Sequence, residues 1–346
     1  MHFEQNLGGA FSIGDVAVRG KAVLAPLSGV TDVAFRRIAL RFGAALVVSE
    51  MVASDEYVRG TAEARLRAEG EGIAPHVVQL AGCDPRWMGE AARLAEAGGA
   101  AVIDINMGCP AKRVTGGYAG SALMRDLELA EKLIAAVVSA VSVPVTVKMR
   151  LGWDDASVNA PELARRAEAL GVKAVTVHGR TRQQFYKGRA DWSRIAAVAE
   201  AVTVPVIANG DIASAGDAAA CLKASGAVAA MVGRAAVGRP WLVGRIAAAL
   251  AGRPYREPSP QEKTEAAVEH YEMLLALFGR EAGLRHARKH LAAYADAARE
   301  EGTGLCDADR LTLVTTTDPA AAIAILRRLH EPADDLRAAA ALKAAA

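Results

Sequence analysis

The stretch Ile103–Ser121 reads IDINMGCPAKRVTGGYAGS, and it decides how the rest of the chain is interpreted. The apolar, β-branched run that ends at Asn106 is typical of a short buried strand. The run breaks into Gly108-Cys109-Pro110, and three more glycines follow by residue 120. A buried strand that ends in a glycine-rich loop is a common way to present a reactive cysteine. A lone cysteine is more often a structural thiol, so its meaning depends on the layout of the whole chain.

That layout is an alternation of apolar strands and amphipathic helices. The predicted strands are Ala22–Ala25, Ala45–Ser49, His76–Leu80, Ala101–Asn106, Pro144–Met149, Ala174–His178, Pro205–Ala208 and Ala229–Val232. The predicted helices are Asp32–Phe42, Asp84–Ala97, Asp126–Val141, Ala160–Leu170, Asp191–Ala201, Ser214–Ala224 and Pro240–Leu250, with a weaker one in Met51–Gly60. This alternation predicts an α/β protein with a (β/α)8 TIM barrel. A doubly wound sheet is disfavoured because no GxGxxG follows the first strand.

The two ends of the chain depart from this alternation. A small hairpin is expected around Ile13–Val18, before the first barrel strand. The run Gly252–Pro260 gathers glycines and prolines and marks a boundary. Beyond it the pattern is helical, with segments predicted at Gln261–Phe278, Leu284–Ala297 and Asp318–Leu329, and Leu336–Ala346 reads as a last helix or a frayed tail. We therefore expect a barrel over residues 1–252 and an all-helical domain over residues 253–346.

Composition narrows the class of protein. The 41 basic and 39 acidic residues leave a net charge of +2, so any nucleic-acid surface has to be local. The four cysteines are far apart and have no ligand-spaced histidine, which argues against a metal site and suits a reducing compartment. No long apolar run and no signal-peptide layout are present, so we expect a soluble, cytoplasmic protein with no membrane contact.

Polar residues stand at nearly every predicted strand end. Active sites of TIM barrels lie at the carboxyl ends of the strands. Any one of these residues has a structural explanation: Gln79 could satisfy a loop carbonyl, and His178 could be a buried core residue. Together they predict one site, composed of Pro26-Leu27-Ser28, Gln79, Asn106, Cys109, Lys148-Met149-Arg150, His178-Gly179-Arg180, Asn209-Gly210-Asp211 and Gly233-Arg234.

The last strand ends indicate what the site binds. The loops after strands seven and eight of such barrels commonly bind phosphate, and here they carry Asn209-Gly210-Asp211 and Gly233-Arg234. Arg234 adds a charge-assisted contact. A phosphorylated cofactor is the natural occupant, and Lys148 in the barrel mouth suits an electron-rich ring that becomes anionic when reduced.

Nine short runs together resemble one family, the bacterial tRNA-dihydrouridine synthases of the B type, which are flavin enzymes. The runs are APLSGVTD (25–32), VSEM (48–51), DINMGCPAK (104–112), AGSAL (119–123), VKMRLG (147–152), VHGRT (177–181), IANGDI (207–212), VGRAAVGRP (232–240) and RKHLAAY (288–294). The resemblance covers Val23 to Leu250 and is weaker beyond. Family members often have PMAG where this chain has Pro26-Leu27-Ser28-Gly29. The difference is small, because this loop is expected to contact the flavin mainly through its backbone.

The resemblance implies a cofactor, an electron donor and a substrate. FMN would be bound by the barrel, with NADPH as the electron donor. The substrate would be a D-loop uridine of tRNA, flipped out to receive a hydride at C6 and a proton at C5 from Cys109. Thiols are mostly protonated near neutral pH, which suits an acid role, and His178 is the next candidate. The implied cofactor residues are Pro26, Leu27, Ser28, Gln79, Lys148, His178, Asn209, Gly210, Asp211, Gly233 and Arg234.

The resemblance also implies where the RNA binds. Asn106 and Arg150, with His178, would hold the uracil carbonyl edge. Phosphate contacts would come from Arg180 and Arg182 in the barrel and from Arg285, Arg288 and Lys289 on one helix of the tRNA-binding domain. For each of these basic residues a solvated surface is about as good an interpretation. No obligate protein partner is indicated.

Two other functions remain open at this point. An FMN barrel acting on a free pyrimidine metabolite explains the strand ends but leaves the helical domain and the basic clusters without a role. A non-catalytic RNA-binding barrel explains the clusters but leaves the strand ends without one. Comparing the reduction of free uridine with that of tRNA tests the first alternative. The yellow colour of bound flavin in the purified protein would exclude the second.

Overall fold

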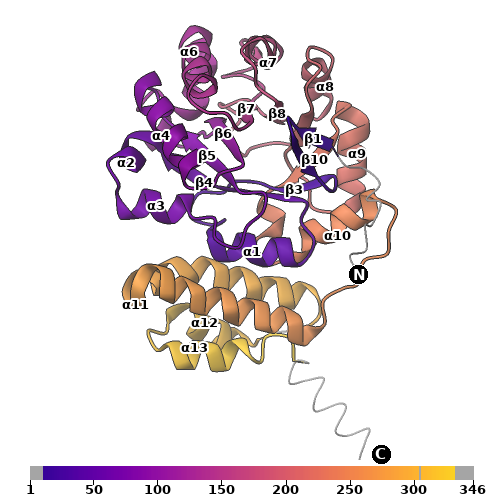
Figure 1. Cartoon of the computed structure of the whole chain (residues 1–346). Helices are drawn as coiled ribbons and strands as arrows, with labels where there is room; N and C mark the ends of the chain where they lie inside the picture. The colour runs from indigo at the N-terminus through magenta and orange to yellow at the C-terminus, as the bar shows by residue number, and fades with distance from the viewer. Residues whose placement is uncertain (1–10, 304, 332–346) are drawn as a thin grey trace, which may run out of the picture. The chain divides into compact units, whose positions relative to one another are not determined.

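The computed structural model describes residues 11–303 and 305–331 (Figure 1). It divides into two compact units, one formed by residues up to 235 together with 242–255, and the other by 236–241 together with 256 onwards. The short run 236–241 therefore groups with the helical unit, although it precedes the boundary expected near Gly252.

The first unit is a closed barrel, and its parallel strands follow one another around the ring in chain order. Within the described residues the ring has eight strands: β3 (Ala22–Leu24), β4 (Leu46–Ala53), β5 (Val77–Ala81), β6 (Val102–Met107), β7 (Val145–Arg150), β8 (Ala174–His178), β9 (Val206–Asn209) and β10 (Ala229–Val232), with β10 pairing β3 to close it. The predicted TIM barrel is confirmed. Every predicted strand is present within a few residues.

Helices lie outside the barrel strands, as Figure 1 shows. They are α1 (Val33–Arg41), α2 (Ser54–Val58), α3 (Ala62–Ala68), α4 (Pro85–Ala97), α5 (Lys112–Thr115), α6 (Leu127–Val138), α7 (Ala160–Ala169), α8 (Ser193–Ala199), α9 (Ala215–Ser225) and α10 (Trp241–Leu250), with short 3-10 helices η1 (Gly120–Arg125) and η2 (Arg234–Ala236). Side-chain caps start many of them, for example Asp32, Asp84 and Asp126.

The segment after the second barrel strand differs from the sequence prediction. A helix was expected within Met51–Gly60, but β4 continues to Ala53 and two short helices, α2 and α3, follow. A register shift between Val48 and Met51 lets β4 keep pairing with β5 as far as Ala53 and Ala81. The extra strand length comes from this pairing, which local sequence does not reveal.

A hairpin closes the amino-terminal end of the barrel. Strands β1 (Phe11–Ile13) and β2 (Val16–Val18) pair antiparallel around Gly14, at φ +60°, which confirms the expected hairpin. Ile13 and Val18 are buried in one cluster with Val23, Leu46, Val77, Val102, Ala174, Ile207 and Ala229 from the barrel strands. The barrel interior is therefore apolar at this end.

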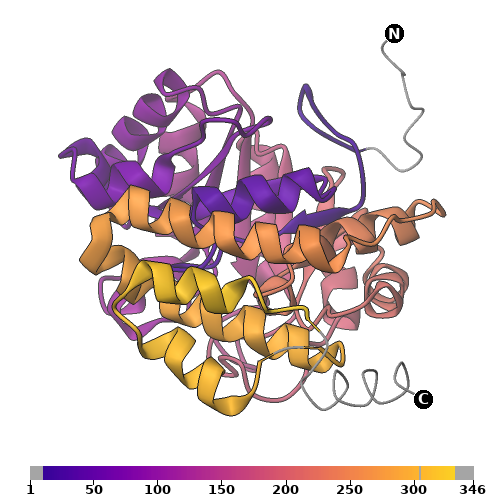
Figure 2. The ribbon, with the colours of Figure 1, turned by 90° about the horizontal axis from the view of Figure 1, so that it is seen from below.

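The second unit is helical. It contains α11 (Pro260–Glu300), α12 (Asp307–Thr315) and α13 (Pro319–Leu326), and Gly279, at φ +73°, breaks α11 into two segments. Figure 2 shows the two segments lying alongside each other, with α12 and α13 packed beside them. No helix was predicted between Ala297 and Asp318, but this stretch holds α12, which is capped by Cys306 and contains buried Leu313. Residues 336–346, expected as a helix or tail, lie outside the described residues.

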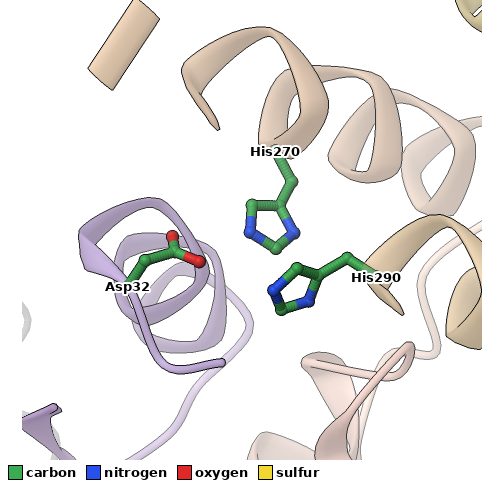
Figure 3. A group of neighbouring side chains, drawn as sticks. All are labelled: Asp32, His270 and His290. Carbon is green, nitrogen blue, oxygen red and sulfur yellow. The ribbon is translucent and has the colours of Figure 1, made fainter. Parts of the chain in front are cut away.

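Aromatic and imidazole rings join the two segments of α11. His270 and His290 meet edge to face with 4.5 Å between ring centroids (Figure 3). The Tyr294 hydroxyl lies 3.1 Å from Nδ1 of His270. His290 is 2% exposed, so its side chain is not part of the basic surface of the same helix. In the part of the chain that is described, no helix is both long and apolar enough to cross a bilayer.

Candidate active site

The barrel gathers the polar strand ends at its carboxyl end, opposite the hairpin. Gln79, Asn106, Lys148, His178 and Asn209 come from β5, β6, β7, β8 and β9. Because all these strands are parallel and follow in order, their carboxyl ends meet at one rim. The sequence prediction of one shared location is therefore confirmed for these residues, whereas their roles remain predictions.

A chain of buried hydrogen bonds runs across the barrel to the cysteine loop. Asp104 accepts hydrogen bonds from the Thr146 hydroxyl and from Nε2 of Gln79, both at 2.6 Å. Oε1 of Gln79 then accepts from Nδ2 of Asn106 at 2.7 Å. Oδ1 of Asn106 accepts from the backbone N–H groups of Gly108 and Cys109 at 3.2 and 3.0 Å.

Asp104 sets the direction of this chain. Its carboxylate, 4% exposed, turns the NH2 group of Gln79 toward itself, so Gln79 presents its carbonyl to Asn106. Asn106 in turn presents its own carbonyl to the cysteine loop. Burial raises the pKa of Asp104, while the hydrogen bonds from Gln79 and Thr146 oppose the rise. The amides of Gln79 and Asn106 thus have a structural role in the ligand-free chain, in addition to the ligand contacts predicted for them.

Further contacts fix the Cys109 loop. The Cys109 carbonyl accepts from both the backbone N–H and the hydroxyl of Ser121, at 3.0 and 2.8 Å. Gly120, at φ +60°, passes so close that an added Cβ would lie 2.8 Å from the same carbonyl oxygen. The thiol of Cys109 is free and partly exposed. The loop is therefore held by its backbone while its thiol is left accessible.

Arg150 ties two loops together. Its Nε donates to the Gly108 carbonyl, and its Nη1 donates to the carbonyls of Thr181 and Phe185, all at 2.9 Å. The side chain is 1% exposed, and burial lowers its pKa to about 10. Arg150 thus already holds the loops after β6 and β8, and a contact with a uracil carbonyl would have to come from its remaining nitrogen.

Lys148 is a half-buried cation in the barrel mouth. Its Nζ donates to Oδ1 of Asn209 at 3.1 Å, and Nδ2 of Asn209 donates to the Met231 carbonyl at 2.7 Å. Burial, helped by the charge of Arg150, lowers the pKa of Lys148 from 10.5 to about 8. The Cys109 loop lies beside both cations, because Arg150 donates to the Gly108 carbonyl at 2.9 Å and Lys148 pairs in register with Asn106. The Cys109 loop and the cation of Lys148 therefore share one site.

Arg180 is buried and bound within the protein. Its guanidinium pairs with Asp211 at 2.5 and 2.9 Å and donates to the carbonyls of Lys187 and Gly188. At 1% exposed it is unavailable to RNA phosphates in this structure, which differs from the expectation for this residue. In the sequence Arg180 belongs to a basic stretch, and nothing there indicates that it pairs with Asp211, which is distant along the chain.

His178 is held as a neutral ring beside these charges. Burial, with Arg150, Lys148 and Arg180 around it, lowers its pKa well below the usual value. Nε2 lies 3.3 Å from Nη1 of Arg180, and because a guanidinium only donates, this nitrogen acts as the acceptor. His178 therefore has little capacity to replace Cys109 as a proton donor near neutral pH.

The expected phosphate end lies at Gly210, Asp211, Gly233 and Arg234. Gly210 is at φ +123°, and an added Cβ would lie 2.6 Å from Ala190 Cβ, so glycine is required here. The carboxylate of Asp211 bonds Arg180, Arg234 at 3.1 Å and the Ala190 N–H, so it positions cations and is unsuited to meet a phosphate directly. The Arg234 side chain is 56% exposed and remains accessible.

The loop Pro26–Ser28 follows β3 and is fixed by residues to which the sequence motifs assign no role. Leu27 N–H donates to the Thr31 hydroxyl at 2.9 Å. Gly29 N–H donates to the carboxylate of Glu50, which is 4% exposed and whose pKa burial raises. Glu50, Asp104 and Ser121 each lie inside one of the runs that resemble the family. For Glu50, the sequence signal that could have identified it is its position directly after the predicted strand end at Ser49.

A cavity of about 590 Å³ opens beside the cysteine loop. It lies among the ends of β4 and β5, helices α2 and α3, and the segment that follows Cys109. Its lining residues include Ser28, Met51, Ala81, Trp87, Val114 and Ala119, with Asp55, Glu56 and Glu63. Arg67 also lines it and pairs with Glu63 at 2.6 Å.

Of the remaining predicted residues, Arg182 is half-buried and the three on α11 are exposed. Arg182, in the loop after β8, lies over the ring of Trp153 with its guanidinium carbon 4.9 Å from the ring centroid. In the helical unit Arg285, Arg288 and Lys289 are exposed on the second segment of α11. His286, from the same basic run, stacks on Phe278 with 4.3 Å between ring centroids.

Comparison with known proteins gives one consistent family. The model of the family described as dihydrouridine synthase (Dus) matches residues 23–305. A probable tRNA-dihydrouridine synthase of Rhizobium leguminosarum is 54% identical over 88% of this chain and 93% of its own length. One from Rhodobacter capsulatus is 53% identical over 88% and 93%. The tRNA-dihydrouridine synthase B of Xanthomonas axonopodis is 48% identical over 82% and 86%.

A solved structure shares the fold at low sequence identity. Histamine dehydrogenase from Rhizobium sp. 4-9 superposes with a TM-score of 0.51 and 15% identity, covering 77% of this chain and 51% of that one. At this identity the likeness concerns the fold alone.

Proposed function

The chain belongs to the dihydrouridine synthase family, and from this premise we propose that it reduces a D-loop uridine of tRNA to 5,6-dihydrouridine, with FMN as cofactor and NADPH as electron donor. The observation that carries the proposal is the meeting of the Cys109 loop with Lys148 and Arg150 at the carboxyl-end rim of the barrel, where Arg150 donates to the Gly108 carbonyl at 2.9 Å and Lys148 pairs in register with Asn106. One rim thus brings a thiol together with a cation suited to a reducible ring.

The residues at the rim fit a flavin mononucleotide. Lys148 uses one donor on Asn209 and has further N–H groups to offer a ring that gains negative charge. Arg234 is exposed at the end of β10, next to Gly233, which suits a single phosphate. The loop Pro26–Ser28 would contact the ring edge. When bound, the flavin supplies the hydride that a uracil ring receives at C6.

The protein's own part is to hold the base and to deliver a proton. A uracil inside a folded RNA has to leave its stack to reach the barrel mouth. Cys109 would hold a proton on Sγ for transfer to C5, because its loop fixes the backbone and leaves the thiol accessible. General acid catalysis of this kind contributes about 10²–10⁴-fold to a rate.

The first experiment tests the reaction itself. Purified holoenzyme is incubated with NADPH and an unmodified tRNA transcript, and the RNA is digested and analysed by mass spectrometry. We expect one or more uridines to gain two hydrogens. Free uridine serves as the comparison substrate, and reduction of free uridine at the rate of tRNA would favour an enzyme of free pyrimidines instead.

The second experiment tests Cys109. Enzyme reduced in advance is mixed with tRNA, and flavin reoxidation is followed in a single turnover. Cys109→Ala should keep its flavin and its reduction by NADPH yet reoxidise about 10²–10⁴-fold more slowly. Cys109→Ser should restore little, because a hydroxyl is a far weaker acid than a thiol. Cys306→Ala, at an exposed thiol of the helical unit, is the matched control.

Reoxidation of Cys109→Ala at the parent rate would make Cys109 a structural thiol. The neutral, accepting state of His178 means that the proton would then have to come from solvent or from the RNA.

A further inference from the structure

Three loops at the carboxyl-end rim meet at one tryptophan. Trp153 lies in the loop after β7, and the guanidinium carbons of Arg125 and Arg182 lie 4.8 and 4.9 Å from its ring centroid. Arg125 ends η1, which continues from the Cys109 loop, and Arg182 lies in the loop after β8. The two cationic carbons are therefore within about 10 Å of each other.

The backbone fixes this arrangement. The N–H groups of Arg182 and Gln183 donate to the carbonyls of Gly152 and Trp153 at 3.0 and 2.9 Å, which joins the loops after β7 and β8. Nδ2 of Asn159 donates to the Met124 carbonyl at 2.7 Å, which joins the β7 loop to η1. The position of both arginines is thus set by main-chain contacts and by the indole.

Within the described residues no carboxylate forms an ion pair with Arg125 or Arg182. The acids nearest in sequence have other partners. Asp126 caps α6, Asp154 accepts from Ser157 and Ala156 of its own loop and from Nε2 of Gln183, and Asp155 pairs with Arg194. Nε of Arg182 is buried and has no hydrogen-bond partner in that same part of the chain.

We propose that Arg125 and Arg182, held by Trp153, form a clamp for the phosphodiester backbone of the substrate RNA. The proposal rests on the proposed function, which supplies an RNA whose uridine reaches Cys109. The charge is complementary to phosphate, and stacked guanidinium groups keep their planar donors free for anionic oxygens. Because η1 links Arg125 to the Cys109 loop through Ser121, the clamp would fix the RNA close to the reacting base.

The test uses the salt dependence of binding. Each phosphate contact contributes about 0.7–0.9 to the slope of log K against log salt, the lower figure applying to single strands. Binding of holoenzyme to an unmodified tRNA transcript is measured by fluorescence anisotropy over a range of salt. Arg125→Ala and Arg182→Ala should each lose affinity about tenfold at low salt and flatten the slope by roughly one contact.

Further variants separate charge from stacking. Trp153→Leu keeps both charges and should weaken binding a few-fold while the slope stays at the parent value, because no cation is removed. Arg93→Ala, at an exposed arginine on α4, is the matched control and should change neither quantity. Flavin content and reduction by NADPH show that each variant is folded, and Arg125→Gln replaces Arg125→Ala if the latter loses its flavin.

The outcomes are distinct. A parent slope in both Arg125→Ala and Arg125→Gln would overturn the clamp, whereas dihydrouridine formation by the parent on the same transcript would leave the proposed function standing. Binding without dihydrouridine formation by the parent would overturn the proposed function, while the slopes would still decide whether Arg125 and Arg182 contact phosphates.

Discussion

At the scale of single residues, burial beside other charges decides what each polar group of the rim does. Lys148 and His178 lie at the ends of adjacent strands, and burial lowers the pKa of both. For Lys148 the value reaches about 8, so the cation persists at neutral pH. For His178 the shift leaves a neutral ring. The same surroundings therefore leave Lys148 charged and His178 neutral near neutral pH.

The pKa of Lys148 leads to a prediction about pH. In the proposed function its cation would stabilise the negative charge that a flavin gains on reduction, and the cation is lost as pH rises through about 8. Reduction of the enzyme by NADPH, measured at saturating NADPH by stopped flow, should slow above that pH. Lys148→Met should be slow at every pH, and Lys148→Arg should keep its rate to higher pH. A parent rate that stays constant from neutral pH to well above 8 would contradict this role.

At the scale of elements, strands β5, β6 and β7 are joined by side chains as well as by their backbones. Asp104 and Asn106 point toward Gln79 from alternate positions of β6, and Thr146 of β7 completes the chain. Buried networks of this kind are costly when one partner is wrong, because an acceptor is then left facing an acceptor. The direction of every amide in the chain is therefore a stability requirement.

Asn106→Asp tests that requirement. The new carboxylate would face Oε1 of Gln79, so it has to be protonated to donate, and its pKa in the folded state should rise. Stability should be near that of the parent below pH about 4 and fall behind by about 1–3 kcal/mol as pH rises to 7. Urea denaturation of both proteins at the two pH values measures the difference. An equal loss at both pH values would mean that the direction of the chain is unimportant.

At the scale of the whole molecule, the chain offers two basic surfaces in two units. One is the Arg125–Arg182 pair of the barrel unit, and the other consists of Arg285, Arg288 and Lys289 on α11. The net charge of +2 means that neither reflects a general excess of basic residues. Two local surfaces suit an RNA that spans more than its reacting base.

Replacing Arg285, Arg288 and Lys289 together by alanine tests the second surface. Binding of tRNA should weaken, with a salt slope flatter by about 0.7–0.9 for each phosphate that these residues no longer bind, while NADPH still reduces the flavin at the parent rate. Arg327→Ala, exposed at the end of α13, is the control within the same unit. A slope equal to that of the parent would show that these residues only solvate the helix.

The sequence by itself determined the barrel and the location of its site. Each barrel strand is a short apolar run, and each run is a local signal that needs no knowledge of distant residues. Because parallel strands in chain order place their ends together, the rim with Gln79, Asn106, Lys148, His178 and Asn209 followed from the order of the strands. The boundaries of β8 and β10 agree with the predicted ones for the same reason.

Only the tertiary structure decided how those residues are used. The extension of β4 to Ala53 depends on pairing with β5, and α12 depends on burial of Leu313 within the helical unit. Arg180 was expected on the surface, but it is buried and pairs with Asp211. Asp211 lies 31 positions further along the chain, so a local pattern could not reveal the pair. The direction of the Asp104–Gln79–Asn106 chain and the meeting of Arg125 with Arg182 at Trp153 likewise join segments remote in sequence. Local patterns determine which elements form, whereas the partner of a polar side chain is set by what the closed barrel brings within hydrogen-bonding distance.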